Sequence, residues 1–129
     1  MMKHILTLSL VAVTLLFLAS CDSVYTYEYR VKNITDTSSM QVRYHFKNDS
    51  TVNTITLAAG QEQLICVTNH GVEAMHGPYN KPVSHDIDSV IVIKNGIRST
   101  KNMLLDDSWI FSVSHATGLY NATISDSEF

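Results

Sequence analysis

Three histidines and two aspartates lie close together in one stretch of the chain. They are His70, His76, His85, Asp86 and Asp88. Imidazole and carboxylate together are suitable ligands for zinc or copper outside the cytoplasm. Metal sites usually show close spacings on a rigid element, whereas the histidines here are six and nine residues apart. We therefore predict no metal site and no cofactor.

The three histidines and Asp86 lie in Thr68–Asp86, which is predicted to be a long loop. Its nineteen residues contain both prolines of the chain and two of its five glycines. Long loops are uncommon in compact domains and are often functional, although a sandwich also needs a solvated crossover between its two sheets. We select it as the candidate binding loop, with these residues as its candidate contacts: His70, His76, Tyr79, His85 and Asp86.

A hydrolase is the enzyme class that these residues could suggest, through His85-Asp86 and a nearby Ser84 or Ser89. A serine nucleophile of that kind needs a Gly-x-Ser-x-Gly turn between a strand and a helix, and the sequence has none. We therefore predict that the protein is not an enzyme.

Cys66 lies in an apolar run, Gln63–Val67, that is typical of a buried strand. No histidine or lysine adjoins it in sequence to lower the pKa of its thiol. We predict an inert core cysteine.

Strands must position all these residues, because the apolar pattern has a period of two. Tyr25, Tyr27, Tyr29 and Val31 alternate with polar residues, and the same alternation continues through residues 40–47. Residues 109–114 and 120–124 alternate as well, with Trp109 on the apolar face. Val90–Ile93 is apolar on both faces, which favours a central strand, and Asn95-Gly96 predicts a tight turn before a return strand over Ile97–Met103. About seven or eight short strands without a helical segment predict an antiparallel β-sandwich, with an immunoglobulin-like arrangement as the favoured topology.

The first twenty residues have the layout of a secretory signal. Lys3 is followed by an uncharged apolar run over residues 5–17, which is too short to cross about 30 Å of hydrocarbon comfortably. The run ends in Leu18-Ala19-Ser20-Cys21, which resembles the lipobox of bacterial lipoproteins. The resemblance implies cleavage before Cys21 and attachment of lipid to its thiol. We therefore expect a signal peptide at 1–20 and one lipid-anchored β-sandwich domain at 21–129.

The overall plan is also similar to that of small all-β lipoproteins of Gram-negative gut bacteria, a resemblance that brings no known activity. Without Lys3 the domain has eight Lys and Arg against twelve Asp and Glu, so nucleic acid is an unsuitable partner. We expect the protein in the cell envelope, held to a membrane through the lipid on Cys21. The sequence favours a non-enzymatic interaction or structural module that binds an envelope protein or glycan.

The alternative is an envelope protein that binds a metal or another small ligand through the 68–86 loop. Convergence of His70, His76 and His85 in space would favour this alternative. Histidines that point apart into solvent would favour the interaction module.

Cys21→Ala should abolish lipidation and leave the precursor uncut or mislocalised, because lipid on Cys21 is the expected anchor. Mass spectrometry of the wild-type and variant proteins from cell envelopes checks this. An unlipidated Cys21 in the mature wild-type protein would refute the lipobox assignment.

Overall fold

The computed structural model describes residues 24–70 and 77–129, so the signal, Cys21 and His76 lie outside the described residues. Eight strands are present in chain order: β1 (Tyr25–Asn33), β2 (Met40–Phe46), β3 (Asn53–Leu57), β4 (Glu62–His70), β5 (Ile87–Lys94), β6 (Ile97–Arg98), β7 (Ile110–Ser114) and β8 (Thr117–Ile124). The helical segments among these residues are three short 3₁₀ turns: η1 (Val83–His85), η2 (Asp106–Ser108) and η3 (Asp126–Glu128). None of the helical turns in the described ranges has the length or apolarity to span a bilayer.

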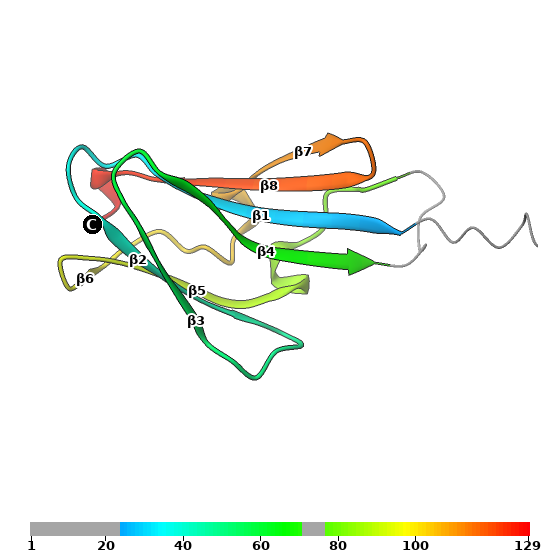
Figure 1. Ribbon diagram of the computed structural model, residues 1–129, viewed down its shortest axis with the longest axis horizontal. Helices are drawn as coiled ribbons and strands as arrows, with labels where there is room; N and C mark the ends of the chain where they lie inside the picture. Colours follow the sequence, from blue (N-terminus) through cyan, green and yellow to red (C-terminus); the bar gives the residue numbers. More distant parts are fainter. Residues whose placement is uncertain (1–23, 71–76) are drawn as a thin grey trace, which may run out of the picture.

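The strands form two four-stranded sheets that pack face to face, as Figure 1 shows. One sheet has the order β4-β1-β8-β7 and the other the order β3-β2-β5-β6. This confirms the predicted β-sandwich, with one difference: β1 pairs with β8 in parallel, so the sheets are not wholly antiparallel. The immunoglobulin-like arrangement is not confirmed. The consecutive strands β1 and β2 lie in different sheets here, whereas the first two strands of an immunoglobulin domain share one.

The alternating residues of the sequence fill the space between the sheets. Tyr27, Tyr29 and Val31 of β1 are at most 2 % exposed, and β2 and β8 bury their alternate residues in the same way. The Tyr29 and Tyr120 rings stack with their centroids 4.8 Å apart. Tyr27 and Tyr29 are therefore core residues, as a strand with one buried face requires, and Tyr25 packs against the core while partly exposed.

A β-bulge explains why two consecutive residues of β4 are both buried. In the pairing of β1 with β4, Tyr29 faces Cys66 and Arg30 faces Leu64, which leaves Ile65 as the extra residue. A bulge of this kind lets Ile65 and Cys66 both turn into the core, where each is 5 % exposed. The prediction that Cys66 is a core residue is thus confirmed.

Two element boundaries differ from the prediction. β4 continues to His70, so residues 68–70 belong to a strand and not to the predicted loop. The predicted return strand over Ile97–Met103 shrinks to two residues. After β6, the Ser99 side chain accepts a hydrogen bond from the Lys101 N–H at 3.1 Å, and the Asn102 side chain accepts one from the Leu104 N–H at 3.0 Å. Such local hydrogen bonds compete with those of a strand ladder.

Trp109 lies in the core just before β7 begins. It is 6 % exposed, its ring meets Tyr29 edge to face at 5.7 Å, and its Nε1 donates to the Met103 carbonyl at 2.8 Å. The alternation over residues 109–114 predicts that Val113 shares the apolar face of Trp109, but Val113 is 51 % exposed on β7, an edge strand of its sheet.

Trp109→Ala should reduce the free energy of unfolding by about 3–5 kcal/mol, because it empties a large aromatic site in the core. Val113→Ala, at an exposed position of the edge strand β7, is the control and should change it by less than about 0.5 kcal/mol. Denaturant unfolding of both variants checks this. Equal stability of the two would show that Trp109 is not a core residue.

Candidate functional site

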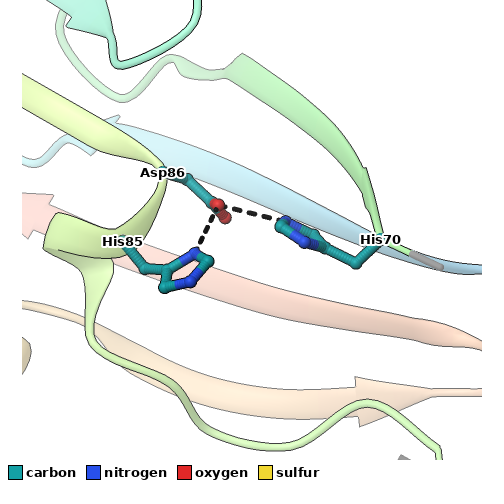
Figure 2. A group of neighbouring side chains, drawn as sticks. All are labelled: His70, His85 and Asp86. Carbon is teal, nitrogen blue, oxygen red and sulfur yellow. Dashed lines mark hydrogen bonds and ion pairs between the residues drawn. The ribbon is translucent and has the colours of Figure 1, made fainter. Parts of the chain in front are cut away.

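The Asp86 carboxylate, immediately before β5, is surrounded by hydrogen-bond donors although its side chain is only 4 % exposed. Its Oδ2 atom accepts from three side chains: the Tyr29 hydroxyl at 2.7 Å, the Thr68 hydroxyl at 3.0 Å and the Lys81 ammonium at 2.7 Å. Its Oδ1 atom faces two imidazoles: His70 Nε2 at 3.0 Å and His85 Nδ1 at 3.3 Å, as Figure 2 shows. We call these six residues the Asp86 centre.

These contacts keep Asp86 ionised. Burial alone would raise the pKa of its carboxyl group. Hydrogen bonds from Lys81, Tyr29 and His85, together with the Lys81 charge, outweigh this effect and hold the pKa well below its usual range. The pKa of Tyr29 is strongly raised, first by burial and then by the hydrogen bond that it donates to Asp86. The Tyr29 hydroxyl therefore stays protonated and donates a hydrogen bond to an ionised carboxylate.

Lys81 provides the compensating charge inside the protein. Its side chain is 4 % exposed, and its ammonium lies 4.0 Å from the centroid of the Tyr27 ring. Gly118 allows the Tyr27 ring to lie against β8, because a Cβ atom at that position would be 2.6 Å from the ring. Removing one partner of a buried ion pair leaves an uncompensated charge, so Lys81 and Asp86 hold each other in place.

His70 Nε2 has two possible partners and can satisfy one at a time. It lies 3.0 Å from Asp86 Oδ1 and 2.7 Å from Lys81 Nζ. As a donor it binds the carboxylate, and as an acceptor it binds the ammonium. The interactions of this nitrogen are therefore exchangeable, whereas the three contacts on Asp86 Oδ2 are fixed.

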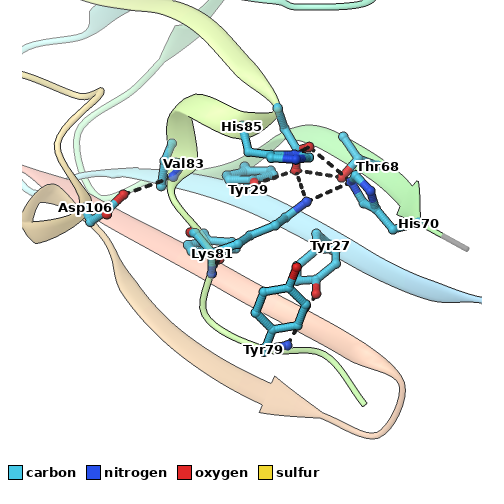
Figure 3. Close-up of polar contacts among 11 residues, drawn as sticks. Tyr27, Tyr29, Thr68, His70, Tyr79, Lys81, Val83, His85 and Asp106 are labelled. Carbon is cyan, nitrogen blue, oxygen red and sulfur yellow. Dashed lines mark hydrogen bonds and ion pairs between the residues drawn. The ribbon is translucent and has the colours of Figure 1, made fainter. Parts of the chain in front are cut away.

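The segment that carries Lys81, residues 77–86, is held by alternate backbone groups. The N–H groups of its odd-numbered residues donate to side chains of the sandwich: Gly77 to Tyr25 at 3.0 Å, Tyr79 to Tyr27 at 3.3 Å, Lys81 to Tyr120 at 2.8 Å and Val83 to Asp106 at 3.0 Å. Tyr120 also donates to the Lys81 carbonyl at 2.8 Å. Figure 3 shows several of these contacts around the Asp86 centre.

Proline occupies two positions where this segment needs no donor. Pro78 and Pro82 alternate with the anchored residues and lack a backbone N–H. The tyrosine hydroxyls thus accept the backbone hydrogen bonds that a neighbouring strand would otherwise accept. Burial raises the pKa of Tyr120 to about 12, so its hydroxyl keeps the proton that it donates.

A small pocket opens beside the Asp86 centre between the ends of β2 and β4. Its volume is about 230 Å³, and it is lined by Phe46, Asn48, Thr68, Asn69, His70 and Asp86. Pockets for drug-sized organic ligands usually measure about 300–1,000 Å³. The space suits a small ligand or a few water molecules.

No family model, curated protein or solved structure matches the chain. The site must therefore be interpreted from its own chemistry.

The structure brings together three of the five candidate contacts. One ligand atom from each of His70, His85 and Asp86 lies within 4.8 Å of the others. Tyr79 is attached to the sandwich through its backbone N–H and is 51 % exposed, and it is not one of these three residues. His76 lies outside the described residues. Asp88 pairs elsewhere, with His45 at 3.0 Å.

Lys81, Tyr29 and Thr68 are the members of the centre that the sequence patterns did not indicate. Tyr29 and Thr68 belong to strands, and a strand pattern shows which face is buried but not what a hydroxyl touches. One signal was available: tyrosine, not phenylalanine, at three alternate positions of a buried strand requires partners for three hydroxyls.

Cys66 should resist alkylation in the folded protein. Burial and, to a smaller extent, the Asp86 charge raise the pKa of its thiol to about 12. At pH 8 the reactive thiolate should be about a thousandfold rarer than in an ordinary cysteine. Iodoacetamide labelling of Cys66, followed by mass spectrometry of the peptide that contains it, should be slow in buffer and fast in guanidinium. Equal labelling rates would contradict the buried position.

Proposed function

We propose that the protein is a non-enzymatic, lipid-anchored binding protein of the bacterial cell envelope that holds a small ligand at the Asp86 centre. The observation that carries this proposal is the convergence of His70 and His85 on a buried carboxylate beside a pocket of about 230 Å³. Such a group is costly to bury for stability alone, since apolar residues of similar volume often serve as well. It favours the ligand-binding alternative over the interaction module.

The chemistry of the nearby hydroxyl groups supports binding over catalysis. Tyr29 and Thr68 both donate to Asp86 Oδ2, but the pKa of that carboxyl group lies well below its usual range, so the carboxylate is too weak a base to take a proton from either hydroxyl. The raised pKa of Tyr29 also keeps its hydroxyl protonated. The Asp86 centre therefore offers fixed hydroxyl and ammonium donors beside two imidazole rings.

The anchor would place this centre close to the membrane. His70 pairs with Tyr25 at the start of β1, and only Asp22 and Ser23 separate Cys21 from the first described residue. An extended chain covers at most about 3.3–3.6 Å per residue, so the lipid lies within about 10 Å of Val24. The ligand would thus be bound at the membrane-facing end of the sandwich.

An interaction module is the second candidate. The edge strand β7 exposes Ile110 and Val113, at 72 % and 51 %. An uncovered edge with apolar side chains can pair with a strand of a partner protein.

Native mass spectrometry of the lipidated protein, released from its own envelope in mild detergent, tests the proposal. The wild-type protein should carry a bound ligand that His85→Asn loses, because His85 is 61 % exposed at the side chain and can be replaced without disturbing the core. His115→Asn in the β7–β8 turn is the matched control and should retain it. Absence of any ligand from all three proteins would contradict the proposal.

A further inference from the structure

We propose that the Asp86 centre binds a divalent transition-metal ion of the zinc class through His70 Nε2, His85 Nδ1 and Asp86 Oδ1. The inference rests on the proposed binding function and names its ligand. Neutral imidazole nitrogen and carboxylate oxygen are the donors that zinc prefers, whereas calcium and magnesium prefer oxygen alone.

The separations between the three ligand atoms suit a tetrahedral ion. Metal–ligand bonds of about 2.0–2.1 Å place neighbouring ligand atoms roughly 3.3–3.4 Å apart. Asp86 Oδ1 lies 3.0 Å from His70 Nε2 and 3.3 Å from His85 Nδ1, and all three atoms are within 4.8 Å of one another. A rotation of the exposed His85 ring closes the remaining gap.

One oxygen of Asp86 would bind the ion, and the other is held by the protein. Oδ2 accepts from Tyr29, Thr68 and Lys81, whereas Oδ1 faces only the two histidines among the described residues. Metal-binding carboxylates are usually held by such outer hydrogen bonds, which fix their orientation. His70 ends β4 and Asp86 precedes β5, so both ligands stand at the ends of sheet strands.

Lys81 limits the affinity of the site for the ion. Its ammonium lies 2.7 Å from His70 Nε2 and would give up that contact while keeping Asp86 Oδ2 and the Tyr27 ring. Two cations then share one carboxylate, which weakens the binding of the ion by repulsion. Such a site suits reversible binding better than permanent structural zinc.

The pocket supplies the fourth position. It borders His70 and Asp86 and has room for water or for a small group of an incoming molecule. Three protein ligands and one open position characterise zinc sites that exchange ligands, in contrast to closed structural sites.

Zinc binding to the lipidated protein in detergent, after treatment with a chelator, tests the inference. Zn²⁺ alone is the probe, and competition with a chromogenic chelator gives the affinity. The wild-type protein should bind one equivalent, and Mg²⁺ should not compete. His85→Asn should weaken binding by at least about 100-fold, because even outer partners of metal ligands contribute 10–100-fold. His115→Asn should bind as the wild type does.

Cobalt provides a second readout. Co²⁺ should give a visible absorption band of tetrahedral intensity in the wild-type protein and in His115→Asn, but not in His85→Asn. Circular dichroism of each variant establishes that it is folded. If His85→Asn does not fold, His85→Gln replaces it in both measurements. Equal zinc affinity in the His85 variants and the wild type would overturn the inference, and so would the absence of binding in the wild type. An organic ligand in the native mass spectrum without zinc binding would overturn it and leave the proposed function standing.

Discussion

The ion pair between Lys81 and Asp86 is the interaction on which this end of the sandwich depends. Both side chains are 4 % exposed, so neither charge is stable there without the other. Asp86 precedes β5 and Lys81 belongs to the segment that crosses between the sheets. The pair thereby joins the crossover to the core, and the tyrosine hydroxyls of β1 and β8 hold its backbone in register.

The same constraint creates the features that could bind a ligand. Because Oδ2 of Asp86 is committed to Lys81, Tyr29 and Thr68, Oδ1 is directed at His70 and His85. The residues that fix the carboxylate are thus separate from those that would contact an ion. A polar centre of this kind beside a small pocket at one end of the sandwich suits the binding of a small ligand.

The strand pattern predicted most of the fold because burial imposes its period directly on residues such as Tyr27, Tyr29 and Val42. It could not predict the parallel pairing of β1 with β8 or the register, which depend on contacts between distant segments. The range selected as the candidate loop, residues 68–86, includes His70, His85 and Asp86, but their spacing in sequence argued against convergence. They converge because β4 extends to His70 and η1 turns His85 back towards it. Lys81 gave no local signal, since a lysine in a loop is normally solvated.

The free energy of unfolding of Lys81→Met, compared with that of Lys32→Met, tests the central claim most directly. Lys32 is exposed on β1, so its replacement is a control for loss of a lysine charge. Lys81→Met should lose about 3–5 kcal/mol, because Asp86 would remain buried without its counterion. Lys32→Met should stay within about 0.5 kcal/mol of the wild type. A Lys81→Met protein as stable as the Lys32→Met control would show that the ion pair does not hold this end of the sandwich together.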